Sequence, residues 1–137
     1  MNGSCCPELI CCLWSSQDLG DLGLGILYKI EKASDWHVAV AAGIYHGSAL
    51  DLKDGFIHLS AAAQVYETAR LHFAGQTDLI LVAMPEAVVT AHLKWEASRG
   101  GQLFPHVFGS LNPDDALWVK PLPWNGVGHD FPAEFTL

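Results

Sequence analysis

The segment 55–60, which reads Gly-Phe-Ile-His-Leu-Ser and is followed by three alanines, constrains the fold of this chain more than any other stretch. Alternation along a strand places Phe56, His58 and Ser60 on one face. Because Ser60 is a good N-cap, the alanine-rich stretch after it predicts a helix that follows the strand directly. A histidine at such a junction either lines a small-molecule site or bonds to a backbone carbonyl in the core.

The rest of the domain alternates short strands with helices, which predicts an α+β fold. A helix over 35–42 is expected to have Ser34 or Asp35 as its cap and to end at Gly43. Its inner face is expected to carry Trp36, Ala39 and Val40. The acidic segment 51–54 is expected to be a solvated loop. We predict five or six strands and two main helices, with strands at 26–30, 56–60, 79–83, 93–97 and 116–120 and helices at 35–42 and 60–74. The continuous apolar run of the 79–83 strand implies cover on both of its faces. In the 60–74 helix, apolar residues repeat at helical spacing and predict its inner face, namely Ala62, Val65, Ala69 and Phe73.

The first 24 residues differ from the rest of the chain. They contain all four cysteines, as Cys5-Cys6 and Cys11-Cys12, and no basic residue. A secretory signal begins with positive charge, and a zinc knuckle spaces its cysteines by two residues, so neither pattern is present. We predict a poorly ordered extension over 1–24 and a single domain over 25–137.

Composition limits the partners. The formal net charge is −8, and only 7 of 137 residues are Lys or Arg, so no basic stripe is available for a phosphate backbone. No apolar run reaches the roughly 18 residues of a membrane helix. Half of the residues are hydrophobic and 16% are charged, as in a globular domain. We therefore expect a cytoplasmic protein whose partner is a small molecule, not nucleic acid or a membrane.

Polar residues able to carry chemistry cluster in two segments. One holds His58 and Ser60, and the other holds Glu96, Arg99 and His106. Glutamate accepts from sugar hydroxyls, and arginine pairs with phosphate or carboxylate, so the two clusters together would suit an anionic or hydroxyl-rich ligand. Two plainer interpretations stay open: Glu96 as a solvated surface residue, and His106 bonded to a loop carbonyl.

Several motifs, taken together in this order, resemble the signatures of a bacterial family known as domain of unknown function 952. The resemblance covers about residues 26–120 and leaves the first 24 residues outside. The motifs are Tyr28-Lys29-Ile30, Gly55-Phe56-Ile57-His58-Leu59-Ser60, His72-Phe73-Ala74-Gly75-Gln76, Lys94-Trp95-Glu96, Ser98-Arg99-Gly100-Gly101 and Phe104-Pro105-His106.

This resemblance implies a fold and a chemistry. The family is remotely similar to the ADP-ribosyltransferase fold, in which two small sheets hold NAD in the cleft between them. It implies that Glu96 is the catalytic acid on the ribose 2′-hydroxyl and that His58 and Arg99 orient the ribose and diphosphate. Tyr28 or Lys29 occupies the place where such enzymes carry a first-strand histidine, which is a departure from their pattern.

Three functions are therefore compatible with the sequence. The first is an NAD-using transferase or glycohydrolase, or a relative acting on an ADP-ribose-like nucleotide. The second is a ligand-binding domain without catalysis. The third is a metal-assisted hydrolase with His58, His106 and Glu96 as ligands. NAD enters as a substrate, and no resident cofactor or metal is indicated.

Overall fold

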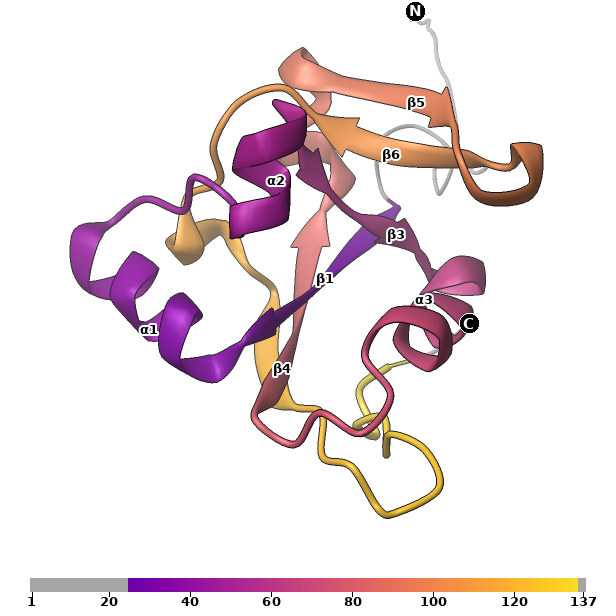
Figure 1. The fold of residues 1–137 in the computed structure, drawn as a ribbon. Helices are drawn as coiled ribbons and strands as arrows, with labels where there is room; N and C mark the ends of the chain where they lie inside the picture. The colour runs from indigo at the N-terminus through magenta and orange to yellow at the C-terminus, as the bar shows by residue number, and fades with distance from the viewer. Residues whose placement is uncertain (1–24, 136–137) are drawn as a thin grey trace, which may run out of the picture.

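The computed structural model describes residues 25–135, apart from the side chain of Arg99. These residues form an α+β domain with seven strands and three α-helices, and two small antiparallel sheets carry the strands (Figure 1). The expected extension over 1–24, with both cysteine pairs, lies outside the described residues. The bounds are β1 Ile26–Lys32, α1 Ala33–Ala42, α2 Ala49–Asp54, β2 Ile57–His58, β3 Ser60–Ala61, α3 Ala62–His72, β4 Leu79–Pro85, β5 Leu93–Ala97, β6 Leu103–Val107 and β7 Trp118–Pro121.

The larger sheet has the strand order β3-β1-β4-β7, and β1 and β4 form its long central pair, in register from Ile26↔Pro85 to Lys32↔Leu79. From Leu79 to Met84 every residue of β4 is buried. A continuous apolar run is typical of a strand covered on both faces, because neither set of side chains can face water. The prediction for this strand is confirmed.

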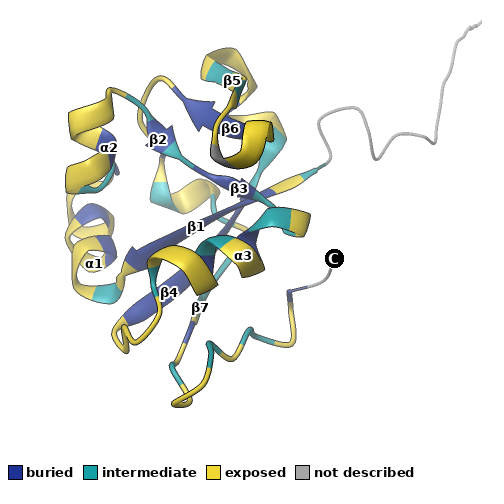
Figure 2. Cartoon of the chain, turned by 45° about the vertical axis from the view of Figure 1, so that its right-hand side comes forward, coloured by how far each residue is buried: buried dark blue, intermediate teal, exposed yellow. Residues whose placement is uncertain are grey.

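Two clusters of buried side chains cover the two faces of the central pair, and Figure 2 shows both of its strands coloured mainly as buried. On one face lie α1, through Trp36 and Ala39, and the smaller sheet β2-β6-β5, through Ile57 and Val107. On the other face α3 packs together with the C-terminal segment, through Phe131 and Phe135. The smaller sheet therefore packs against one face of the larger sheet, and the strands of the domain are divided between the two sheets.

Helix α1 forms where the sequence predicts it, but its start and one of its faces differ. It begins after Lys32, whose side chain makes no cap, instead of after Ser34 or Asp35. Val40, expected inside, is 51% exposed. The helix ends as predicted at Gly43, whose φ of 78° is a left-handed conformation that glycine adopts at low cost.

For helix α3 the buried face is predicted correctly, but the start of the helix is not. Val65 and Ala69 are buried, as expected from their spacing. Ser60 does not cap the helix, since it still belongs to β3 and pairs with β1. The helix begins after Ala61, whose N–H donates to the Gln64 side chain at 3.0 Å.

Among the described residues, no helix is long and apolar enough to cross a membrane.

The acidic segment 51–54 is not a solvated loop, as the sequence suggested, but most of the short helix α2. Its N-cap is Ser48, whose hydroxyl accepts from the Asp51 N–H at 3.2 Å, while the Asp51 carboxylate accepts from the Ser48 N–H at 2.9 Å. This reciprocal capping box fixes Asp51 at the start of the helix. Asp51 is 1% exposed, so the acidic character of the segment misled the prediction.

Candidate functional site

The predicted strand 56–60 is in fact two short strands that belong to different sheets. His58 in β2 pairs with His106 in β6, and the Leu59 N–H donates to the Pro105 carbonyl at 3.1 Å. Two residues after His58, Ser60 in β3 pairs with Tyr28 in β1. We call residues 57–61 the crossing segment, because they carry the chain from the smaller sheet to the larger.

A cavity of about 640 Å³, hereafter the cleft, lies where the two sheets part. Small-molecule sites occupy roughly 300–1,000 Å³, so its size suits a ligand of nucleotide dimensions. Its walls come from β1, α2, the crossing segment, α3 and β6. Polar residues of the cleft wall include Lys29, Glu31, Asp51, His58, Ser60 and His106.

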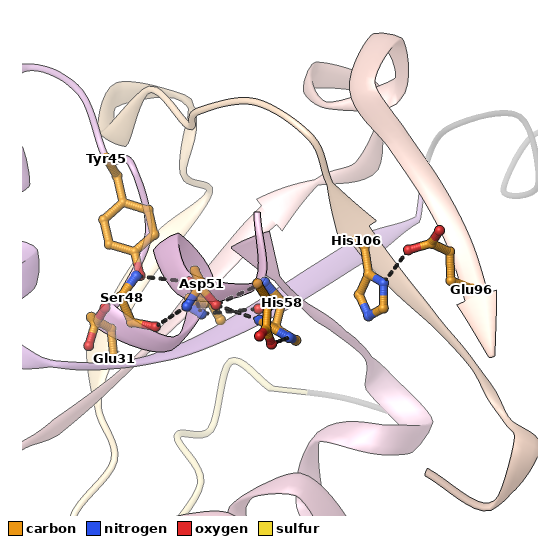
Figure 3. Close-up of polar contacts among 9 residues, drawn as sticks. Glu31, Tyr45, Ser48, Asp51, His58, Glu96 and His106 are labelled. Carbon is orange, nitrogen blue, oxygen red and sulfur yellow. Dashed lines mark hydrogen bonds and ion pairs between the residues drawn. The ribbon is translucent and has the colours of Figure 1, made fainter. Parts of the chain in front are cut away.

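Asp51 connects three parts of the cleft wall (Figure 3). Its Oδ2 accepts from the Lys29 ammonium of β1 at 2.6 Å and from the Ser48 N–H at 2.9 Å. Its Oδ1 lies 2.6 Å from Nδ1 of His58 and accepts from the His58 backbone N–H at 3.2 Å. One buried carboxylate therefore ties α2, β1 and the crossing segment together.

These partners also control the charge of Asp51. Burial by itself raises the pKa of the carboxyl group, because the charged form loses its hydration. The hydrogen bond from His58 and the charge of Lys29 outweigh that cost and hold the pKa of Asp51 well below its ordinary value. The carboxylate therefore stays ionised near neutral pH.

Both ring nitrogens of His58 face carboxylates. Nδ1 lies 2.6 Å from Asp51 and Nε2 lies 3.1 Å from Asp54, and a ring protonated at both nitrogens satisfies both contacts. The Lys29 ammonium also donates to the His58 carbonyl, at 3.2 Å. His58 is thus held in the wall with its polar atoms in contact with other groups of the protein.

His106 has a different arrangement. Its Nδ1 lies 2.8 Å from Oε1 of Glu96, and its ring stacks on Phe56 with centroids 4.1 Å apart. It is 5% exposed, and among the described groups, which leave out the Arg99 side chain, none forms a hydrogen bond with its Nε2. Because Glu96 accepts the proton of Nδ1, the neutral ring carries its lone pair on Nε2. Figure 3 shows the ring extending away from Glu96.

The two polar clusters of the sequence come together through this pair of histidines. The rings of His58 and His106 lie 5.4 Å apart between centroids, on paired residues of β2 and β6. Glu96 is neither a fully solvated residue nor a part of the cleft lining, since it reaches the cleft through His106. The alternative in which His106 bonds a loop carbonyl is wrong.

Glu31 is a second buried carboxylate in the cleft wall. Its Oε2 accepts from the Tyr45 hydroxyl at 2.5 Å, and its Oε1 accepts from the Lys32 backbone N–H at 2.7 Å. Burial, together with the hydrogen bond to Glu31, raises the pKa of Tyr45 far above its ordinary value. Both donors to Glu31 are therefore uncharged groups.

The remaining predicted site residues lie in different settings. Tyr28 lines the cleft but also packs in the core, 5.0 Å from Phe135 between ring centroids, and burial raises its pKa. Ser60 is buried, with its hydroxyl 3.3 Å from that of Thr68. The side chain of Arg99 lies outside what the structure describes.

Sequence reasoning missed three acidic residues of the site and a tyrosine that contacts one of them. For Asp51 a signal existed, because Ser48-Ala-Leu-Asp51 has the spacing of a capping box before a short helix. No comparable signal exists for the others, since they meet their partners only through packing of distant segments. These residues are Asp51, Asp54, Glu31 and Tyr45.

Within residues 25–135, no group of three or more His, Cys, Asp or Glu side chains could hold a metal ion. The metal hypothesis relied on His58, His106 and Glu96. Here the nitrogens of His58 face Asp51 and Asp54, and Glu96 faces one nitrogen of His106. Each of these contacts would have to break before the groups could converge on an ion.

Comparison with known proteins places the chain in a family. Residues 30–119 match the family described as protein of unknown function (DUF952). The chain belongs to the DUF952 family. No curated protein matches this DUF952 chain.

Solved structures that match it include those of protein CC0527 from Caulobacter crescentus. The X-ray structure is 43% identical in sequence, with a TM-score of 0.72, and the match covers 76% of this chain and 91% of CC0527. The solution NMR structure of the same protein has a TM-score of 0.69, at 43% identity, and covers 76% of this chain and 90% of that chain. These matches support the described fold and do not show a likeness to ADP-ribosyltransferases.

Proposed function

We propose that the cleft binds NAD or an ADP-ribose-like nucleotide and that the protein breaks the bond between the ribose and its base, passing ADP-ribose to water or to another acceptor. The observation that carries the proposal is the state of His106. This buried residue lines a cavity of ligand size, its Nε2 has no hydrogen-bond partner among the described groups, and a carboxylate holds its Nδ1.

The roles follow from this geometry. Nε2 of His106 accepts a proton from the attacking water or acceptor hydroxyl as its oxygen bonds to C1′ of the ribose. The bond from C1′ to the base breaks, and the base leaves with the electron pair. Glu96 is a positioning residue that fixes the ring tautomer and stabilises the imidazolium that forms. The buried carboxylates around the cleft favour the positive charge that develops on the ribose.

The support for this class of ligand has two sources. The cleft volume matches a nucleotide-sized molecule, and the motif resemblance to the ADP-ribosyltransferase fold suggests that NAD lies between two small sheets. In β1, Tyr28 or Lys29 stands where ADP-ribosyltransferases carry a first-strand histidine. Lys29 is paired with Asp51 and Tyr28 packs in the core, so neither side chain takes the role of that histidine directly.

A second candidate function is a ligand-binding domain without catalysis. It is favoured by the pairing of Lys29 and His58 with Asp51, which leaves their polar atoms in use within the protein. In this case the cleft would bind the nucleotide and release it unchanged.

The test measures NAD binding by thermal shift and nicotinamide release by chromatography for Glu96→Gln, His106→Asn and the double variant. We expect each to lose about 100-fold or more in release, with NAD binding changed by less than about threefold. Because the two residues act as a unit, the double variant should lose no more than His106→Asn. Glu96→Gln should also shift the pH profile of any residual activity, which a purely structural role would not do.

The matched control is Glu67→Gln, a glutamate exposed on α3 that pairs with Arg70 at 2.6 Å. It should leave both binding and release unchanged. NAD binding without nicotinamide release by the wild-type protein would favour the non-catalytic function. Loss of binding in proportion to release for Glu96→Gln would contradict its positioning role.

A further inference from the structure

Lys29, a buried cationic side chain of the described cleft wall, and the half-buried ring of His58 both have carboxylate partners. Lys29 lies 2.6 Å from Asp51, and His58 lies between Asp51 and Asp54. A phosphate entering this part of the cleft would therefore meet no unpaired buried cation. A buried anion without a partner loses its hydration without compensation, which is strongly unfavourable.

The same wall also contains a buried negative charge that has no cationic partner among the described residues. Glu31 is 5% exposed, and its donors are the Tyr45 hydroxyl and the Lys32 N–H, so no described cation balances its charge. The side chains of Lys32 and Asp35 also line the cleft, with one charge of each sign, and both residues are exposed, where solvent screens them. The buried part of the cleft consequently attracts positive charge and repels negative charge.

His106 adds an independent preference. Its Nε2 lone pair accepts a hydrogen bond from a hydroxyl, whereas an ionised phosphate has only acceptor oxygens to offer it. In the complex this donor is the water or acceptor hydroxyl that attacks C1′, and the ribose supplies hydroxyl donors for the nearby carboxylates. Hydrogen bonding and charge therefore both favour the ribose and its base over the phosphate groups of a nucleotide.

We propose that the buried part of the cleft recognises the N-riboside end of its ligand, preferring one with a cationic base, and that the phosphate groups remain outside it. This inference rests on the proposed function and narrows it, because the phosphate-free N-riboside becomes the smallest ligand that binds fully. The nicotinamide ring of NAD carries such a positive charge in its oxidised form.

The experiment compares three ligands that share the same base and ribose, namely nicotinamide riboside, nicotinamide mononucleotide and NAD, by calorimetry on the full chain. The riboside should bind within about threefold of NAD or tighter, with little dependence on salt. Binding of the mononucleotide or NAD about tenfold tighter than the riboside would overturn the inference and leave the proposed function standing. Failure of all three to bind would overturn both.

A second comparison isolates the charge. The oxidised riboside should bind the wild-type protein about tenfold tighter than its reduced, uncharged form, and Glu31→Gln should remove most of that difference. Glu67→Gln serves as the matched control and should preserve the difference. Equal binding of the oxidised and reduced ribosides by the wild-type protein would contradict the preference for positive charge, whether or not Glu31→Gln folds.

Discussion

At the scale of single residues, Asp51 organises the site. Its two oxygens contact the side chains of Lys29 and His58 and the N–H of Ser48, which belong to separate segments. A buried ion pair is costly to break from one side, because the remaining partner keeps its charge without compensation. Asp51 therefore contributes to stability as well as to the shape of the cleft.

We predict that Asp51→Asn lowers the free energy of unfolding at pH 7 by about 3–5 kcal/mol, measured by urea denaturation, because Lys29 is left buried without its counter-charge. The pKa of Asp51 is lower in the folded protein than in the unfolded chain, so its stabilisation is present above the unfolded value of about 4. As pH falls below that value toward the folded pKa, the wild-type protein loses its advantage and the two proteins converge.

The control for this prediction is Asp54→Asn. Asp54 contacts the same histidine but is partly exposed, so its removal should cost about 1 kcal/mol or less at pH 7. An equal cost for the two variants would mean that burial of the Lys29 pair does not determine the effect. A difference that stays constant down to about pH 2 would contradict the assignment of the depressed pKa to Asp51.

At the scale of elements, the cleft depends on short segments with tight local geometry. Helix α2 spans six residues, and β2 and β3 span two residues each. Gly47, just before the Ser48 cap, has a φ of 113°, and a Cβ built there would lie 2.6 Å from the Cβ of Asp51. Only glycine lets the chain pass this close to Asp51.

Gly47→Ala should destabilise the protein by about 1–3 kcal/mol, since the added methyl group both strains the backbone and displaces Asp51. Denaturation with urea measures the loss, and it should be accompanied by weaker ligand binding in the cleft. Gly128→Ala is the matched control, because nothing lies within 4 Å of its added Cβ and its φ is not in the left-handed region. A neutral result at Gly47 would show that α2 can move away from β1 freely.

At the scale of the whole molecule, the two sheets differ in how well they are covered. The central strands β1 and β4 have a buried cluster on each face, whereas β5 at the edge of the smaller sheet contains no buried residue. Stability within a protein is not uniform, and exposed edges open with less free energy than buried strands. The cleft lies between the more stable part and the less stable one.

Native-state hydrogen exchange should therefore give the highest protection to the amides of β4 and clearly lower protection to those of β5. Addition of a cleft ligand should raise protection in the crossing segment and in β6, which form part of its wall. Protection of β5 equal to that of β4 would contradict a separation of the two sheets in stability. Ramped urea during the exchange would distinguish local from global opening.

The sequence by itself determined the features that depend on local pattern. The apolar run of β4, the inward face of α3 and the stop of α1 at Gly43 follow from periodicity and from backbone chemistry. The α+β class with small split sheets also agrees with the structure. Two strands go beyond the five predicted ranges, because the stretch 56–60 forms two strands instead of one and β6 lies where no strand was predicted.

Only the tertiary structure decided the character of the site. Whether segment 55–60 is one strand or two depends on its neighbours, and pairing of His58 with β6 and of Ser60 with β1 opens the cleft between them. The same pairing brings Glu96 to the cleft through His106 and turns Asp51 from an expected loop residue into a buried carboxylate. Such contacts join segments far apart in the chain, and local pattern carries no information about which segments will meet.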